Sequence, residues 1–132
     1  MTQASYGYTK NLGKMAFDDA VEKVTAALKD QGFGVLTEID VKATLKKKLD
    51  VDFRPYKILG ACNPPFAHKA LSNELLVGLL MPCNVVVFEE DDGTLAVSII
   101  DAKEMFKVVD NPGVEPLAKE VDGMLKKVLE SL

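Results

Sequence analysis

The chain has 132 residues, enough for one domain with its own hydrophobic core and too few for a multidomain machine. With 48% hydrophobic and 27% charged residues, its composition is that of a folded globular protein and excludes general disorder. Its net charge of -4 disfavours nucleic-acid binding, because a phosphate backbone attracts basic surfaces. We therefore expect a single domain over residues 1–132 that binds no nucleic acid.

The sequence gives no sign of export or of membrane insertion. The first residues lack the basic and apolar regions of a secretory signal. The longest apolar stretch, 75–87, is interrupted by Gly78, Pro82 and Asn84 and is shorter than the ~20 residues of a membrane helix. Two cysteines are too few for a secreted disulfide framework. These features predict a cytoplasmic protein with free thiols and no membrane partner.

The first third of the chain predicts two strands and two helices. Alternating apolar residues indicate a strand over 5–12 and another over 33–39. Between them, apolar residues spaced by three and four from Phe17 onward predict an amphipathic helix that Gly32 terminates. Asp40 can then cap a short helix whose apolar side chains are Val41, Leu45 and Leu49.

The rest of the chain predicts a third strand, a helix, a hairpin and a long C-terminal helix. Asn63 is a good N-cap and Pro64 a good first helical residue. Asp101 can cap a short segment that ends at Phe106. The expected elements are strand 56–62, helix 64–73, strands 85–89 and 95–100 joined by the turn at 91–93, and a helix with the apolar stripe Leu117, Val121, Met124, Val128 and Leu132.

This order, β-α-β-α-β-α-β-β-α, predicts a two-layer α+β fold with a sheet of about five strands and helices packed mainly on one face. Each long helix has one apolar stripe and so needs one partner. The other sheet face then needs a different cover. We expect apolar rows such as Leu36 with Leu59 and Val86 with Phe88 to lie there and to form a homodimer interface.

The chemistry-bearing residues with the most suggestive positions are two Cys-Asn dipeptides. The sequence contains no G-x-S-x-G, P-loop, G-x-G-x-x-G, H-E-x-x-H or C-x-x-C motif. Cys62-Asn63 follows one predicted strand, and Cys83-Asn84 precedes the next. If these strands are antiparallel, the two cysteines lie at the same end of the sheet; if they are parallel, they lie at opposite ends.

The same-end arrangement favours a thiol site, although a simpler interpretation exists. Cys62 would lie just ahead of a helix N-terminus, whose dipole and free N–H groups lower a thiol pKa. The amides of Asn63 and Asn84 could hold a ligand. In the simpler interpretation the cysteines belong to the core, and the asparagines are cap and turn residues.

Three charged or metal-ligating features have ordinary explanations. A metal site on Cys62, His68 and Cys83 would leave one coordination position open, but its spacing matches no zinc pattern, so we expect no metal. The run Glu89–Asp92 is explained by a hairpin turn. The lysines 46–48 fit a solvated helix end that complements the dipole.

Four segments together are similar to the family named Domain of Unknown Function 302. They are 36–41 (LTEIDV), 56–64 (YKILGACNP), 70–71 (AL) and 78–87 (GLLMPCNVVV). The resemblance implies a small two-layer α+β domain, often a homodimer, with no accepted catalytic residues. It adds weight to a patch of Cys62, Asn63, Pro64, Pro82, Cys83 and Asn84. One departure is Ala102 after Asp101, where similar sequences tend to have Asp-Pro.

These observations leave three hypotheses for function. The first is a homodimeric module that binds a small molecule or a sulfur-containing partner at a patch of Cys62, Asn63, Pro64, His68, Pro82, Cys83 and Asn84. The second is a thiol redox protein or sulfur carrier, with Cys62 as nucleophile and Cys83 as resolving thiol. The third is an interaction module with structural cysteines. The sequence leaves the cofactor, if any, and enzymatic activity undetermined.

Overall fold

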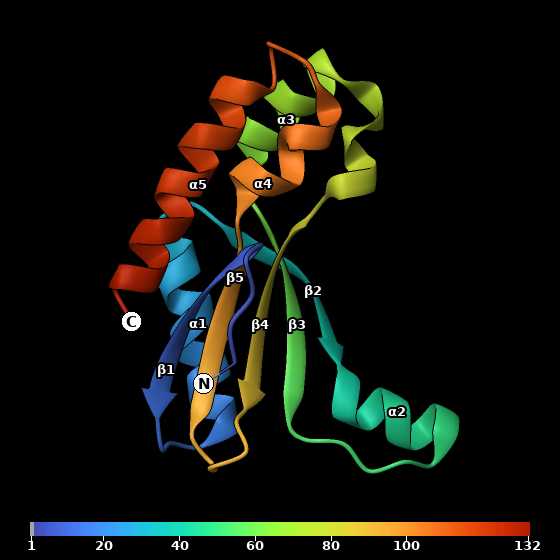
Figure 1. The fold of residues 1–132 in the computed structure, drawn as a ribbon, viewed down its shortest axis with the longest axis vertical. Helices are drawn as coiled ribbons and strands as arrows, with labels where there is room; N and C mark the ends of the chain where they lie inside the picture. Colours follow the sequence, from blue (N-terminus) through green and yellow to red (C-terminus); the bar gives the residue numbers. More distant parts are fainter. Residues whose placement is uncertain (1) are drawn as a thin grey trace.

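The computed structural model describes residues 2–132 and has two layers, a sheet and a set of helices (Figure 1). The sheet is antiparallel, in the order β1-β5-β4-β3-β2. Its strands are β1 (Gly7–Gly13), β2 (Gly34–Asp40), β3 (Tyr56–Cys62), β4 (Cys83–Glu89) and β5 (Leu95–Ile100). The predicted fold class and element order are confirmed.

The helices differ in how they relate to the sheet. The long helices α1 (Phe17–Asp30) and α5 (Glu115–Glu130) cover one sheet face. At one end of the sheet lie α3 (Pro64–Asn73), η1 (Leu75–Leu80), α4 (Ala102–Phe106) and η2 (Lys107–Val109). Helix α2 (Val41–Leu49) projects from the opposite end, away from the body (Figure 1).

The core lies between the two long helices and the sheet face that they cover. The α1 stripe contributes Ala20, Val21, Val24, Ala27 and Leu28, which are buried at the predicted helical spacing. The α5 stripe and alternate strand residues complete the core: Leu59, Val85, Val87, Val97, Ile99, Val121, Leu125 and Val128. Because burial removes these side chains from water, this layer supplies most of the driving force for folding.

One predicted row of the uncovered sheet face is wrong. Leu59 is fully buried in the core, where it is paired with Val85, and it therefore faces the helices. Its expected neighbour Leu36 lies at a register irregularity in β2 and is exposed. Val86 and Phe88 alternate with core residues of β4, so they do lie on the sheet face that no helix covers, here called the uncovered face. Phe88 is nevertheless only 6% exposed, and residues 2–4 line a shallow pocket with it on this face.

The starts of three strands also differ from the prediction. β1 begins at Gly7 and not at residue 5, because the Gly7 N–H donates to the Ala4 carbonyl and closes a turn. Phe33 precedes β2 and is buried in the core. β4 begins two residues early, because Cys83 still pairs with Ala61.

A polar cluster under α5 ties the helical layer to β1. The Tyr8 hydroxyl donates to Asp122 Oδ1 at 3.1 Å, and Asp122 is only 2% exposed. The Nζ atoms of Lys126 and Lys103 lie 3.3 and 3.7 Å from Asp122 Oδ2. Apolar periodicity could not predict this cluster, since Asp122 interrupts the buried stripe of α5.

Asp101 caps α4 as predicted, and its removal should destabilise the protein. Its side chain accepts a hydrogen bond from Glu104 N at 3.1 Å. Burial acts to raise the pKa of Asp101, but this hydrogen bond, the Tyr8 hydroxyl and the Lys103 charge together hold it below the ordinary value. We expect Asp101→Ala to lower the free energy of unfolding by about 1 kcal/mol at pH 7.

The same substitution should cost less at acid pH. A carboxyl whose pKa is lowered by folding stabilises the protein above its unfolded pKa, and this contribution disappears as pH falls through the folded pKa. Urea denaturation of Asp101→Ala and wild type at pH 7 and pH 3 measures the difference. Asp52→Ala, whose side chain is 95% exposed, is the control. Equal losses in both variants would contradict the capping role.

Candidate functional site

The register of β3 and β4 brings the two cysteines to the same end of the sheet. The strands are antiparallel and pair Ala61 with Cys83, so Cys62 lies one residue beyond this pair. The antiparallel alternative is therefore the correct one. Both cysteines are free thiols; Cys83 is buried and Cys62 is half-buried.

The two thiols nevertheless belong to different sets of side chains. Cys83 shares the core face with its partner Ala61. Because successive strand residues point to opposite faces, Cys62 belongs to the alternate set of β3. Burial, and secondarily the nearby Cys62 thiol, raises the pKa of Cys83 to about 11, so this group is a neutral thiol at physiological pH.

The first turn of α3 offers no free N–H group to a thiolate. Pro64 and Pro65 have no N–H. The Phe66 N–H donates to Asn63 Oδ1 at 3.5 Å, and the Ala67 N–H donates to the Asn63 carbonyl at 2.9 Å. The expected activation of Cys62 by free helix N–H groups therefore lacks its donors in this turn.

Asn63 has a structural role that accounts for its position. It is 8% exposed and caps α3. Its side-chain nitrogen also lies against the turn after α1, where a Cβ at Gly32 would come within 3.1 Å of it. Gly32 has φ of +83°, so this turn requires glycine on both counts. Asn63 thus joins the β3–α3 junction to the α1–β2 turn.

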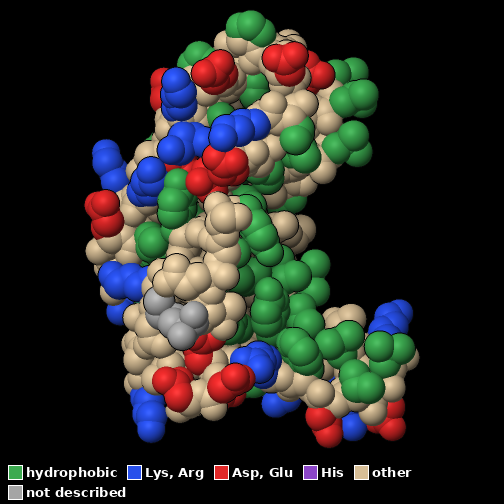
Figure 2. All heavy atoms as spheres, viewed as in Figure 1, with side chains coloured by type: hydrophobic (Ala, Val, Ile, Leu, Met, Phe, Trp, Pro, Cys, Tyr) green, Lys and Arg blue, Asp and Glu red, His purple; other side chains and the backbone are tan. Residues whose placement is uncertain are grey.

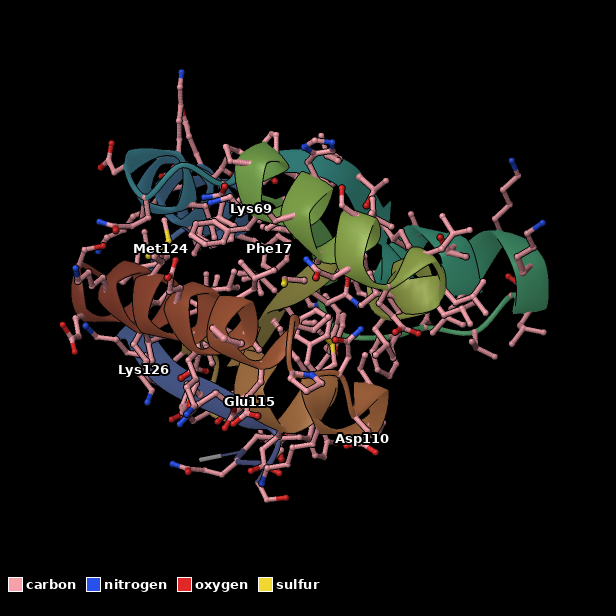
Figure 3. The ribbon with its side chains drawn as sticks, turned by 90° about the horizontal axis from the view of Figure 1, so that it is seen from above. Phe17, Lys69, Asp110, Glu115, Met124 and Lys126 are labelled. Carbon is pink, nitrogen blue, oxygen red and sulfur yellow. The ribbon has the colours of Figure 1, made fainter. Side chains whose placement is uncertain are left out.

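A small apolar cavity lies beside these residues, between α3, α4, α5 and the ends of β3 and β4. Its volume is about 40 Å³. Figure 3 looks down on this end of the molecule, where α3, with Lys69, and the start of α5, with Glu115, flank the region. The wall includes Phe33, Ala61, Cys62, Asn63, Phe66, Ala70, Met81, Cys83, Phe106, Leu117 and Val121. Asn63 is the one polar side chain among them, apart from the two thiols.

The predicted patch is thus only partly assembled around the cavity. Of its seven residues, Cys62, Asn63 and Cys83 are in the wall. His68 is exposed on α3, and Asn84 is exposed beyond Cys83. Pro64 and Pro82 are not in the wall. Within residues 2–132, no three His, Cys, Asp or Glu side chains are arranged to hold a metal ion.

The sequence analysis placed Leu117 and Val121 on an apolar helix stripe but assigned none of the helical side chains of the cavity wall to a site. Phe66 and Ala70 are one turn apart on α3, and Leu117 and Val121 are one turn apart on α5. Their spacing marks them as inward-facing. Their meeting with Phe106 depends on how three separate helices pack, which no local pattern specifies.

The uncovered sheet face forms a second, larger apolar surface. Figure 2 shows hydrophobic side chains in a band over β4 and β3 that continues to α2. The Tyr56 ring stacks on Phe88 at 5.8 Å and lies 6.1 Å from Phe53. Six residues on or beside this surface expose 41–69% of their area: Tyr6, Leu36, Ile39, Leu49, Val51 and Phe53. Among the described residues, no helix is both long and apolar enough to span a membrane.

Comparison with known proteins identifies relatives over nearly the whole chain. Residues 8–132 match the family described as "Domain of unknown function DUF302". The structure is similar to the crystal structure of an uncharacterized conserved DUF302 protein from Bacillus stearothermophilus, with a TM-score of 0.86 and 30% identity. That alignment covers 96% of this chain and 98% of the other. No curated protein matches.

Proposed function

Because the chain belongs to the DUF302 family, whose description assigns no activity, we propose from its own geometry that it is a homodimeric module that binds a small ligand in the cavity beside Cys62 and Cys83. The main support is the chemistry of the cavity wall. Phe33, Phe66 and Phe106 contribute aromatic surface, and the thiols contribute soft, polarisable atoms.

The wall selects an uncharged, apolar ligand. Asn63 already accepts a hydrogen bond from the α3 backbone, and Cys83 is a neutral thiol. A charged ligand would lose its hydration without gaining a counter-charge, at a cost of several kcal/mol. Small thioethers, thiols and hydrocarbons avoid this cost.

The size of the cavity limits the ligand further. An apolar cavity of about 150 Å³ binds benzene in a known engineered case. The present volume of about 40 Å³ is well below that, so a ring-sized ligand requires wall side chains to move. Met81 is suited to such movement because its side chain is unbranched and flexible. Dimethyl sulfide and xenon are suitable first probes.

Filling the cavity should abolish ligand binding. Ala70 is 8% exposed and belongs to the wall, so Ala70→Leu places three further carbons in the cavity. Ala26→Leu makes the same change at an exposed position of α1. We expect dimethyl sulfide to raise the melting temperature of wild type and Ala26→Leu and not that of Ala70→Leu. No shift in wild type, or equal shifts in all three proteins, would refute the ligand site.

The dimer is supported by the apolar character of the uncovered face. A stable interface typically buries ~800 Å² on each partner. The largest exposed apolar patch on a monomeric protein usually spans about 300–600 Å². A contiguous exposed apolar patch of this size or larger favours association with a partner. Tyr56 and Val86 are half-buried on this face, and the exposed apolar residues lie on or beside it. Phe88, on the same face, is already 6% exposed and adds little to the exposed surface. A second copy is therefore the proposed cover.

The two rival functions receive less support. As a resolving thiol, Cys83 would need to reach Cys62, but Cys83 pairs with Ala61 and is one residue out of register with Cys62. The pKa of Cys83, about 11, also leaves little of this group as thiolate at neutral pH. A module with purely structural cysteines remains the alternative if the ligand test fails.

A further inference from the structure

The charges of this protein are unevenly distributed along the chain. Residues 41–54, which comprise α2 and the segment after it, contain five basic and two acidic residues. This segment, here called the α2 arm, has a net charge of +3, whereas the whole chain has -4. The remaining residues therefore carry a net charge of -7. A basic projection on an acidic body indicates a binding element for a negatively charged surface.

Helix α2 is the exposed part of the arm, whereas the segment after it contacts the body through Phe53 and Arg54. No residue of α2 is buried, and the helix projects from the sheet (Figure 1). Leu49, Val51 and Phe53 expose 66%, 44% and 41% of their area. The apolar band of the uncovered face runs on to this arm (Figure 2). A nine-residue helix gains little stability by itself in water, so a partner would stabilise it.

An acidic surface lies at the same end of the uncovered face. The β4–β5 turn contains four consecutive acidic residues, Glu89–Asp92. Glu90 is 9% exposed and accepts hydrogen bonds from Thr2, so the acidic surface consists of the other three. The Asp91 side chain is 92% exposed, although it pairs with Arg54 at 2.8 Å. Arg54 also donates to the Glu89 carbonyl, so the end of the arm and the turn of one copy lie side by side at this end of the sheet.

A two-fold axis parallel to the strands would bring arm and turn together between two copies. Sheets that pack face to face keep their strands nearly aligned. Such an axis places the same end of both sheets together. It lays the β2 edge of one copy over the β1 edge of the other. The arm follows the edge strand β2, whereas β5 lies on the other side of the sheet, next to β1. The arm of one copy would therefore lie over the β1–β5 side of the other, at the end that has the acidic turn.

We infer that the α2 arm of each copy docks on the acidic β4–β5 turn of a second copy while their uncovered sheet faces pack together. This inference rests on the homodimer proposed above and identifies its interface. Tyr56, Val86 and Leu49 supply apolar contact, and Lys46–Lys48 supply charge complementarity. Paired charges at the rim of such an interface set its specificity and make it sensitive to salt.

Charge reversal tests the interface without altering the core. The arm variant replaces Lys46, Lys47 and Lys48 by Glu, and the control variant replaces Lys23, Lys29 and Lys127, which are exposed on the helical face. Sedimentation of full-length chains should give a dimer for wild type and control. The arm variant should have a dissociation constant at least tenfold higher. Circular dichroism establishes that each variant is folded.

A complementary variant distinguishes lost contacts from general damage. The turn variant replaces Glu89, Asp91 and Asp92 by Lys, so its arm and turn are both basic, whereas both are acidic in the arm variant. Each variant alone should dimerise weakly. Their mixture should form a heterodimer of wild-type strength, because each arm then meets a turn of opposite charge.

The outcomes separate this interface from the homodimer itself. A dimer that arm reversal leaves unchanged overturns the docking inference and leaves the homodimer intact. A wild-type chain that is monomeric at high concentration overturns both. A monomeric chain that sediments with vesicles of anionic phospholipid, and loses this binding in the arm variant, assigns the arm to a lipid surface and also overturns the inference.

Discussion

Replacing Phe33 by alanine should destabilise the protein and at the same time create a binding site for benzene. Phe33 is 1% exposed and is the largest of the fully buried side chains. Removing a buried phenylalanine ring typically lowers the free energy of unfolding by about 3–5 kcal/mol. Since Phe33 belongs to the cavity wall, the lost ring volume should join the existing space of about 40 Å³.

The enlarged cavity should then accept a ring-sized ligand. Apolar cavities of this kind stay dry and bind benzene, and a ligand that binds only the folded state stabilises it. We expect benzene to raise the melting temperature of Phe33→Ala by several degrees while leaving wild type almost unchanged. Xenon and dimethyl sulfide, which are smaller than benzene, should stabilise both proteins.

Leu28→Ala provides the matched control. Leu28 is fully buried in the same core but is not part of the cavity wall. Its truncation should cost about 2–5 kcal/mol. Benzene should stabilise it less than Phe33→Ala, because its new space is not continuous with the cavity. Equal stabilisation of both variants, or none in Phe33→Ala, would contradict the cavity's role.

Most of the fold could be predicted from local patterns, and the wrongly assigned sheet face has an identifiable cause. The α1 stripe, the hairpin, the caps Asp40, Asn63 and Asp101, and the order of elements all follow from spacing and cap chemistry. The prediction that Leu59 lies on the face opposite the helices is wrong. The face on which a strand residue lies can be assigned only when the register of the strand with its neighbours is known. A shift of one residue moves every side chain of the strand to the other face.

The same limitation affected the candidate site. The sequence allowed Cys62 and Cys83 to lie at one end of the sheet. Whether their side chains share a face depends on the strand register, which pairs Ala61 with Cys83. The free N–H groups expected ahead of α3 are missing for a reason visible in the sequence, because Pro64 and Pro65 occupy the first turn. Proline both favours this helix start and removes its donors.

The polar cluster of Tyr8 and Asp122 should show energetic coupling. Asp122→Leu removes the carboxylate to which the Tyr8 hydroxyl donates and leaves Asp101 as the other carboxylate beside it, so the expected cost is that of one hydrogen bond, about 1 kcal/mol. Lys103 and Lys126 are 42% and 43% exposed, so they can turn to water. Tyr8→Phe with Asp122→Leu replaces both partners by apolar groups and should cost less than the two single changes together.

Alkaline titration tests the same contact independently. Burial, and secondarily the carboxylates around the hydroxyl, raises the pKa of Tyr8 to about 12. Because the folded pKa lies above the ordinary value of 10, the protonated hydroxyl stabilises the fold fully below pH 10, and this contribution disappears as pH rises through 12. Wild type should therefore lose stability over this interval, and Tyr8→Phe should lose less.

Tyr6→Phe separates this effect from general alkaline unfolding. Tyr6 is 65% exposed, and the substitution removes the same hydroxyl group from a tyrosine two residues away. Urea denaturation at intervals between pH 8 and pH 12 should give Tyr6→Phe the wild-type slope and Tyr8→Phe a smaller one. If the slope of Tyr8→Phe equals that of wild type, the alkaline loss arises elsewhere, for example in the paired lysines around Asp122. A smaller slope, together with coupling in the mutant cycle, would establish the Tyr8–Asp122 contact as the link that fastens α5 to β1.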